Sequence, residues 1–550
     1  MDTLFINGSQ QETSIKVSGF YTYCLRNGSV QGNGNISLED SEVLNNKALK
    51  LRDEYTEFIY SLNRLFLEAK LVYKKSMSLF FFTDLSNKRT EIFDTFSSIC
   101  HINIIINLIN KYEIKNIILD RCDDAFESAL RSKIGSLNIV SNGTIMHKRY
   151  GIYELLKQFK FILKSIIKRI LLGFYSKNEP RSRNITNLFF SIFPLLLNND
   201  FVDEKYKSFV KKGDIFLASV LTDGMHQNQS IITYKNEVKI LSLMGEHILL
   251  DRYIQLRDFV RVNYYLISLT IKKKRILKKQ YLFQGIDISK FIRFEIEQSF
   301  IRLPRQILYH YPLKRIFNKF CIKQFNYYLH EYSFGRFFTY VLKSEFPDIK
   351  TVGFQHGPAA ERRLLYMLAK GEACSETNDW LRELPIPDSV IAEDDLSKEI
   401  YIQQGYNNVV VMETIYRFDY LKSIVRNVNK DLILIVPGLH DGLNILQKIY
   451  KEIKSNNDKT YLLKPHPRSS VFKKGIPESV HLPNLKLVNK HISTYLEIVS
   501  EVIVTYSSVG YEACQLGIPV RMFCLPGRIS ESPLLDLNQN ENQKIKIIFC

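Results

Sequence analysis

The sequence predicts an α/β protein with two lobes of parallel strands, the first of which carries a helical and basic elaboration. Short β-branched apolar segments alternate with helical patterns, most regularly after residue 386. A long, mostly helical stretch occupies about 150–345, and the positive charge is concentrated before residue 351. We therefore expect a first lobe at 1–385 and a second lobe at 386–550.

Length and composition indicate an ordinary globular protein. The chain has 550 residues, of which 45% are hydrophobic and 24% charged, enough for two or three domains. Its eight cysteines show no CxxC pair and no metal-ligand spacing, so we expect reduced, cytosolic thiols. The opening residues lack a basic segment followed by an apolar one, and no run of eighteen apolar residues occurs. We expect a cytoplasmic protein with neither a secretory signal nor a spanning helix.

The first lobe is expected to begin with a polar, peripheral segment at 1–45 that contains one strand near 17–25. A helical pattern follows at 46–75, and buried strands are expected at 78–83 and 116–120 with a helix at 90–112 between them. Asp120 ends the second of these strands. It is a weak candidate for the acceptor side, and a solvated helix start is the more ordinary explanation.

Two further strand ends in the first lobe carry polar residues. Residues 216–226 read as a strand and a polar turn, which makes Asp223 and His226 weak acceptor-side candidates. Residues 351–358 read as a strand that ends in Gln355, His356 and Gly357, and ligands bind at the carboxyl ends of strands in open parallel sheets. His356 is a candidate general base or substrate clamp, and a structural role is equally compatible with the pattern.

The second lobe reads as a doubly wound sheet with helices between several of its strands. Gly438 and His440 lie in a glycine-containing loop after one strand, where the backbone can approach a phosphate closely. Arg417 follows another strand and is a candidate for pairing with a phosphate or a carboxylate, although a surface position is at least as compatible. The expected strands are 388–391, 409–412, 432–436, 460–464, 485–488, 502–505 and 520–523.

The segment Thr505-Tyr-Ser-Ser-Val-Gly-Tyr-Glu512 reads as a strand end, a polar turn and a helix start. Ser507 and Ser508 stand where unpaired N–H groups favour an anion. A capping box would place its acid at position 511, which is Tyr. Glu512 is therefore available to accept hydrogen bonds from ribose hydroxyls, and we expect this segment to hold a phosphorylated nucleotide.

The segment Lys464-Pro-His-Pro-Arg468 is a strand end held extended by two prolines. Alternate side chains of an extended chain share a face, which groups Lys464, His466 and Arg468 as a cationic edge. We expect His466 to donate to the departing oxygen of a phosphate. A stiff structural turn is the alternative.

These motifs carry a family resemblance. The sequences QHG at 355–357, KPHPR at 464–468 and TYSSVGYEACQLGIPV at 505–520 resemble bacterial surface-polysaccharide glycosyltransferases of the GT-B fold, which has two Rossmann-like lobes. The chain is most similar to surface carbohydrate biosynthesis proteins related to capsule Kdo-transferases, bacterial sialyltransferases and CDP-glycerol glycerophosphotransferases. The resemblance implies donor-phosphate contacts for His466, Ser507 and Ser508, and a donor contact for Glu512.

Positive charge points to the partners of the first lobe. Residues 351–550 hold 23 Lys+Arg and 23 Asp+Glu, so the whole excess of +18 lies in the first 350 residues. The segment 154–174 reads as an amphipathic helix with lysines at 157, 160, 164 and 168, a pattern typical of an interfacial anchor on an anionic membrane. Packing of its apolar side on the lobe is an equal alternative. No nucleic-acid-binding motif accompanies the charge, so we expect no nucleic acid partner.

The residues and the resemblance together predict a transferase that needs no cofactor or metal. We expect it to pass a sugar from a nucleotide-sugar to a glycan or lipid-linked glycan acceptor at the inner face of the cytoplasmic membrane. The resemblance favours a CMP-activated acidic sugar such as Kdo or a nonulosonate. Two alternatives stay open: a CDP-polyol phosphotransferase, and a non-catalytic membrane-associated assembly subunit.

Overall fold

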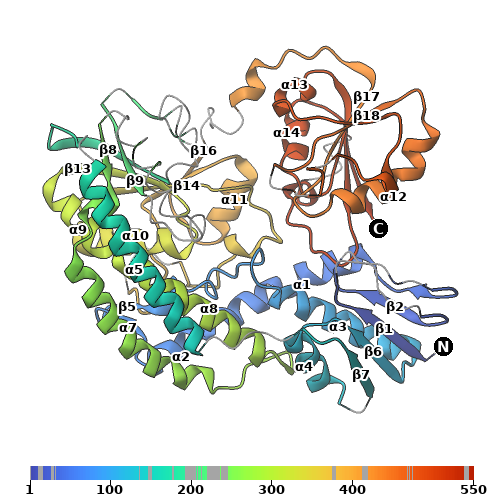
Figure 1. Cartoon of the computed structure of the whole chain (residues 1–550), viewed down its shortest axis with the longest axis horizontal. Coiled ribbons are helices and arrows are strands. Elements are labelled where there is room, and N and C mark those ends of the chain that lie inside the picture. Colours follow the sequence, from blue (N-terminus) through green and yellow to red (C-terminus); the bar gives the residue numbers. More distant parts are fainter. Residues whose placement is uncertain are drawn as a thin grey trace.

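Three parallel sheets of five, seven and six strands form the framework of the molecule (Figure 1). The seven- and six-stranded sheets with their helices make two Rossmann-like lobes, so the predicted α/β fold class with two such lobes is confirmed. The five-stranded sheet is a third parallel sheet that the sequence does not predict as a unit. The computed structural model describes the chain apart from residues 1, 10–16, 27–29, 31, 136, 146–150, 176–178, 193–202, 204–205, 207–208, 212, 220–235, 237–238, 240–245, 374–378, 412–418, 468, 470, 474 and 538–543.

The five-stranded sheet has the strand order β3-β2-β1-β6-β7, with β1 at its centre. Leu4, Phe5 and Ile6 of β1 are fully buried. The expectation that residues 1–45 are peripheral is therefore wrong, because this short apolar segment is paired on both edges. The strands are β1 (Thr3–Asn7), β2 (Tyr21–Cys24), β3 (Ile36–Ser37), β6 (Asn116–Asp120) and β7 (Asn138–Asn142).

The helices of this first sheet follow the sequence pattern closely. Asp40 caps α1 by accepting hydrogen bonds from the backbone N–H groups of Glu42 and Val43 at 2.8 and 3.1 Å. The strand expected at 78–83 is wrong: after the short hairpin of β4 (Val72–Tyr73) and β5 (Met77–Ser78) the chain forms a buried 3₁₀ helix at Leu79–Phe82. The helices are α1 (Ser41–Ser61), α2 (Asn63–Glu68), α3 (Thr95–Tyr112) and α4 (Asp124–Lys133).

The seven-stranded sheet has the order β10-β9-β8-β13-β14-β15-β16. The strands expected at 388–391 and 409–412 are β15 and β16, which extend this sheet, so their placement in the second lobe is wrong. The sheet of the last lobe starts only at Asn429. The strands are β8 (Asn184–Ile192), β9 (Ile215–Ser219), β10 (His247–Leu249), β13 (Cys321–Tyr328), β14 (Lys350–Phe354), β15 (Ser389–Ala392) and β16 (Val409–Val411).

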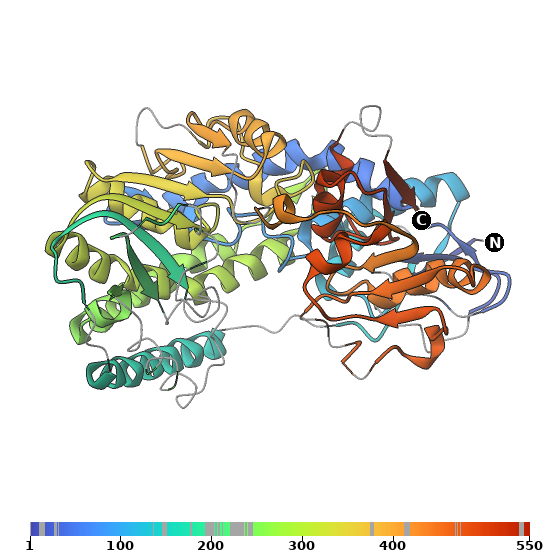
Figure 2. The same cartoon turned by 90° about the horizontal axis from the view of Figure 1, so that it is seen from above.

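Helices cover this sheet, which confirms the predicted helical elaboration. The central helix α8 packs against α5, α7, α9 and α10, and α5 lies on the outside of the lobe (Figure 2). No helix in the described part of the chain combines the length and apolarity needed to cross a bilayer. The helices are α5 (Gly151–Tyr175), α7 (Leu256–Leu277), α8 (Ser289–Leu308), α9 (His310–Lys319), α10 (Ser333–Glu345) and α11 (Asp395–Gln403).

The six-stranded sheet has the order β19-β18-β17-β20-β21-β22 and matches the alternation expected from sequence. Its strands are β17 (Asn429–Val436), β18 (Thr460–Leu463), β19 (Leu485–Leu487), β20 (Val499–Val504), β21 (Val520–Cys524) and β22 (Ile545–Phe549), of which β22 is not predicted. Its helices are α12 (Gly442–Ser455), α13 (Ile492–Leu496) and α14 (Val509–Gln515).

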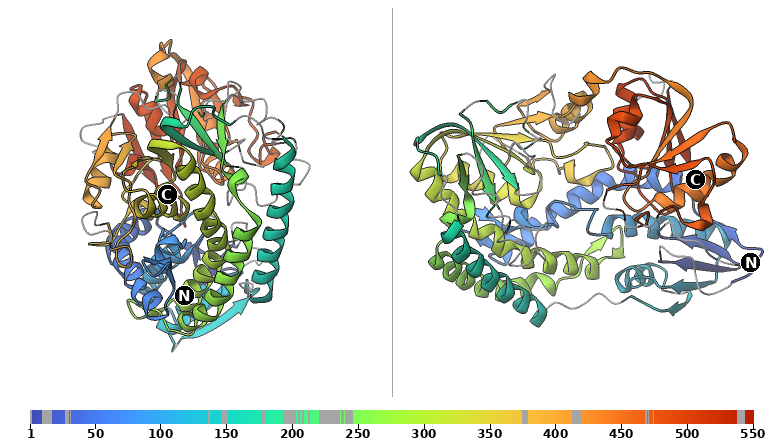
Figure 3. Two further views of the ribbon diagram at one scale, coloured as in Figure 1. Left: turned by 90° about the vertical axis from the view of Figure 1, so that its left-hand side faces the viewer. Right: turned by 45° about the horizontal axis from the view of Figure 1, so that its top comes forward.

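The six-stranded lobe rests on the five-stranded sheet and α1 (Figure 3). The backbone N–H of Ser530 donates to Oδ1 of Asn45 at 2.8 Å. Gly527 has a φ of +70°, and a Cβ atom there would lie 2.9 Å from the carbonyl oxygen of Cys24. The loop after β21 is therefore pressed against the end of β2, which fixes the two lobes around the space between them.

Candidate active site

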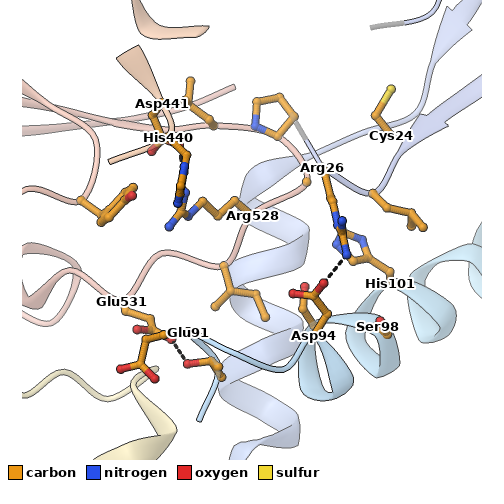
Figure 4. A pocket seen from close by; sticks show the side chains of 18 of the residues that line it. Cys24, Arg26, Glu91, Asp94, Ser98, His101, His440, Asp441, Arg528 and Glu531 are labelled. Atoms are coloured by element: carbon orange, nitrogen blue, oxygen red, sulfur yellow. Dashed lines mark hydrogen bonds and ion pairs between the residues drawn. The ribbon is translucent and has the colours of Figure 1, made fainter. Parts of the chain in front are cut away.

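A cavity of about 1840 Å³ lies where the lobes meet, and strand ends from all three sheets line it (Figure 4). The five-stranded sheet contributes Gly8 after β1 and Arg26 after β2. The six-stranded sheet contributes the segments after β17, β18, β20 and β21, and the seven-stranded sheet contributes the turn after β14. Ligands of open parallel sheets bind at this edge. The cavity is therefore the candidate active site.

Four of the residues predicted from the sequence line this one cavity: His356, His440, His466 and Ser508. They follow four different strands, β14, β17, β18 and β20. The topology thus brings together groups that can donate hydrogen bonds to an anion, as the motifs predict.

His356 is positioned by aromatic rings and by its neighbour Gln355. Its imidazole stacks on Tyr328 with ring centroids 6.0 Å apart and lies edge-on to Tyr332 at 5.8 Å. The buried amide of Gln355 donates to the carbonyl of Gly357 at 2.7 Å and accepts from the N–H of Glu393 at 2.8 Å. Gln355, a predicted acceptor-side residue, lies beneath the cavity and shapes the turn that presents His356.

Ser508 and Glu512 contact each other at the start of α14. The Ser508 hydroxyl donates to Oε1 of Glu512 at 3.3 Å, and the hydroxyl of Tyr420 donates to Oε2. Glu512 is buried and does not line the cavity. Ser507 also lies outside the lining, with its hydroxyl accepting from the N–H of Val509 at 3.4 Å. In this structure Glu512 ties α14 to the segment around Tyr420.

The expected cationic edge is not assembled as predicted. Lys464 does not line the cavity: its ammonium donates to the carbonyl of Lys490 at 2.7 Å and lies 6.0 Å from the ring of Tyr495. Burial lowers the pKa of Lys464. The expected shared face needs a regular strand, whereas β18 ends at Leu463. His466 alone of this motif is placed at the cavity, and Arg468 lies outside the described residues.

Gly438 permits a close approach, as expected, but the group that approaches its backbone is the side chain of Tyr506 and not a phosphate. A Cβ atom at position 438 would lie 2.0 Å from the ring of Tyr506. The guanidinium of Arg528 stacks 3.8 Å from the centroid of the same ring and pairs with Asp441 at 2.9 Å. Burial opposes the charge of Arg528, but Asp441 and Tyr506 outweigh it and raise its pKa. The result is a fixed cationic wall beside His440.

A second charged group at the cavity joins segments that are far apart in the sequence. Arg363 lies 3.2 Å from Glu91 and 3.8 Å from Glu531. Burial raises the pKa of Glu531, and the neighbouring Glu91 adds to this effect while Arg363 opposes it. Arg89 lies over the ring of Tyr332 at 4.9 Å. No sequence motif marks these residues, because their proximity arises only from the packing of the lobes.

The five-stranded sheet supplies the opposite wall. Arg26 pairs with Asp94 near His101 (Figure 4). The Nδ1 atom of His101 lies 2.8 Å from the hydroxyl of Tyr23. Burial lowers the pKa of His101 to about 4, so this imidazole is neutral at pH 7. The predicted candidate Asp120 does not line the cavity; its carboxylate is buried and accepts from Asn142 at 3.2 Å.

The remaining predicted residues, Arg417, Asp223 and His226, lie outside the described residues. Within the part of the chain that the structure describes, no group of three or more His, Cys, Asp or Glu side chains is arranged to hold a metal ion.

Comparison with known proteins gives similarity of structure alone. No family model matches the chain, and no curated protein matches it. The UDP-GlcNAc 2-epimerase from Neisseria meningitidis bound to UDP-GlcNAc is 12% identical, with a TM-score of 0.32 over 62% of this chain and 82% of that one. The glycotransferase of kitacinnamycin is 10% identical, with a TM-score of 0.33 over 67% of this chain and 87% of that one.

The wall teichoic acid polymerase TagF is also similar, at 13% identity and a TM-score of 0.28 over 70% of this chain and 86% of that one. These values do not identify a family. The sheets themselves show the α/β fold with Rossmann-like lobes.

Proposed function

We propose that the chain is a glycosyltransferase of bacterial surface polysaccharide biosynthesis. It transfers a sugar from a nucleotide-sugar, with a CMP-activated acidic sugar such as Kdo or a nonulosonate as donor, to a glycan or lipid-linked glycan. One observation carries this proposal: His440, His466 and Ser508, from three strand ends of the six-stranded sheet, line the same cavity. That arrangement suits the phosphate of a nucleotide.

Each group has a role in this proposal. The imidazole of His466 donates to the leaving phosphate oxygen, His440 donates to a neighbouring oxygen, and the Ser508 hydroxyl turns from Glu512 to donate to the same phosphate. Arg528, held flat against Tyr506, supplies positive charge beside them. These side chains neutralise the leaving group, so the proposed reaction needs no metal.

The acceptor occupies the side of the cavity formed by the five-stranded sheet and the turn after β14. His356 is the proposed general base, because its ring lines the cavity and is oriented by Tyr328 and Tyr332. Two arginines contact neighbours of this imidazole: Arg89 lies over the ring of Tyr332, and Arg363 donates to the carbonyl of Pro358. Their positive charge suits the carboxylate of an acidic donor sugar.

The proposal is tested by supplying the purified protein with isotope-labelled CMP-activated acidic sugars and, separately, with CDP-glycerol. We expect CMP release with the first donor and a loss of at least about tenfold in the His466→Ala variant. Turnover of CDP-glycerol alone would replace the proposal with a polyol phosphotransferase. If neither donor is bound or consumed, the chain is an assembly subunit without this chemistry.

A further inference from the structure

The outer helices of the seven-stranded lobe turn apolar stripes toward solvent. On α7 the stripe recurs at steps of three and four residues, so it follows one helix face for about 22 Å. Its members and their exposed fractions are Leu256 (61%), Val260 (69%), Tyr264 (80%), Ile267 (64%) and Ile271 (67%). The opposite face, with Phe259, Val262, Leu269 and Ile276, is buried against the lobe.

Helix α5 carries a second outward stripe of Leu156, Phe159, Leu163 and Ile170, each more than half exposed. The helix packs on the lobe through another face, where Ser165, Lys168 and Leu172 are buried. Lys168, expected on the solvent side, is thus on the packed side. Phe161, Ile162 and Ile166 of α5 are partly buried against the core, so α5 packs through part of its apolar surface and exposes the rest.

Both helices are anchored on α8, so α5 and α7 lie on the same flank of the molecule. Arg305 of α8 lies over the ring of Phe161 of α5 at 4.6 Å, and Lys273 of α7 lies over Phe300 of α8 at 5.3 Å. Figure 1 and the right-hand view of Figure 3 show α5 and α7 running along this flank, away from the six-stranded lobe.

The charge on these helices is almost entirely positive. Together α5 and α7 contain eleven Lys and Arg residues and two acids, Glu154 and Asp258. Asp258 is buried and pairs with Arg315 at 2.6 Å. Arg257, Arg261, Lys274 and Arg275 of α7 are exposed beside the stripe. A ligand for this flank must accept apolar side chains and present negative charge.

We infer that α5 and α7 form a two-helix surface that lies on an anionic lipid bilayer, with the apolar stripes in the headgroup and acyl boundary and the basic side chains on lipid phosphates. A second copy of the chain fits less well, because a symmetric contact would bring two sets of like charges together. A nucleic acid offers the charge but no apolar phase for nine exposed side chains. This inference does not depend on the proposed transferase activity.

Sedimentation of the full-length protein with vesicles tests the inference without any substrate. One set of vesicles contains phosphatidylglycerol and phosphatidylcholine, and the other contains phosphatidylcholine alone. We expect binding at least about tenfold tighter to the anionic vesicles, and weaker binding as salt is raised. Equal binding to both sets would overturn the electrostatic part of the inference.

Three paired variants assign the binding to its helices: Val260→Gln with Ile267→Gln on α7, Phe159→Gln with Leu163→Gln on α5, and Lys274→Glu with Arg275→Glu. Each is expected to weaken vesicle binding at least about tenfold. The matched control is Val425→Gln with Val428→Gln, which alters two exposed valines on the six-stranded lobe and should bind normally. Unchanged binding in all three variants would overturn the inference. It would also be overturned if the parent chain bound no vesicles and instead formed a concentration-dependent dimer that these variants disrupt.

Discussion

The ring of Tyr506 occupies the space in which a side chain at position 438 would begin: a Cβ atom on Gly438 would lie 2.0 Å from Cε1 of that ring. The backbone N–H of Gly438 donates to the hydroxyl of Thr505 at 2.8 Å, which holds the end of β17 against the end of β20. This contact places Tyr506, and through it Arg528, at the wall of the cavity.

Replacing Gly438 with Ala should therefore displace Tyr506 and undo its stacking with Arg528 at 3.8 Å. We expect the free energy of unfolding to fall by about 1–3 kcal/mol, because a close-packed contact must open. We also expect nucleotide affinity, measured by calorimetry, to fall at least about tenfold, since a charged wall of the site moves. Gly135→Ala is the control, because a Cβ there meets its nearest atom at 3.7 Å. Nucleotide affinity equal to that of the control would show that Tyr506 and Arg528 do not bind the donor.

Replacing Gln355 with Leu should damage the turn that presents His356. The substitution leaves the buried N–H of Glu393 without its acceptor at 2.8 Å, at a cost of about 1–3 kcal/mol in unfolding free energy. Chemical denaturation measures this loss, and kcat should fall with it. Gln403→Leu, at an exposed position on α11, is the matched control. A stable Gln355→Leu variant with normal kcat would contradict the role given to this amide.

Glu295 should make stability depend on pH. The carboxyl is buried beside Thr95 at the start of α3, and burial raises its pKa to about 8. The folded state then keeps a proton that the unfolded state releases above about pH 4.5. The contribution of Glu295 to the free energy of unfolding is therefore largest at low pH. It falls as pH rises from about 4.5 to 8, by up to about 1.4 kcal/mol per pH unit.

Denaturation of the Glu295→Gln variant beside the parent chain between pH 5 and 8 measures this effect. The variant should gain stability relative to the parent as pH rises, because an amide has no proton to lose. Glu68→Gln, at a half-exposed carboxylate, is the control. A constant difference between parent and Glu295→Gln across the range would show that Glu295 is ionised in the fold.

Replacing Arg363 with Lys should lower both the stability of the protein and its affinity for the donor. Its guanidinium reaches Glu91 at 3.2 Å and the carbonyl of Pro358 at 2.9 Å and lies 5.5 Å from the ring of Tyr366, and an ammonium cannot make all of these contacts. We expect a loss of about 1–3 kcal/mol in stability and a higher KM for an acidic donor. Arg64→Lys, on an exposed helix position, should change neither. Unaltered stability and KM in Arg363→Lys would remove this cluster from the account.

The sequence predicts the six-stranded lobe well because its strands are short, apolar and separated by clear turns. It also predicts the positions of His356, His440, His466 and Ser508, since each follows such a strand and all parallel strand ends point to one edge. Strand β13 lies between two helical stretches, and its mixture of polar and aromatic residues does not distinguish it from them. The five residues of β1 stand in a polar neighbourhood and carry too little periodicity to predict a strand.

The charged residues of the site lay beyond sequence reasoning for a different reason. Glu91, Arg363 and Glu531 come from three parts of the chain and meet only through the packing of the lobes. A regular extended chain predicts that Lys464 shares a face with His466, but the Lys464 ammonium donates to the carbonyl of Lys490 instead. Local pattern fixes where a residue lies along an element, whereas side-chain partners depend on packing.

The proposed function requires that His466 and Ser508 hold the same phosphate group. A double-mutant cycle tests it most directly: calorimetric titration of CMP into the parent chain, His466→Ala, Ser508→Ala and the combined variant, with the exposed His481→Ala as control. We expect that CMP binds, that each single variant loses about five- to tenfold in affinity, and that the combined loss is smaller than the product of the two. Absence of CMP binding by the parent chain, or affinities that do not change in any variant, would contradict it.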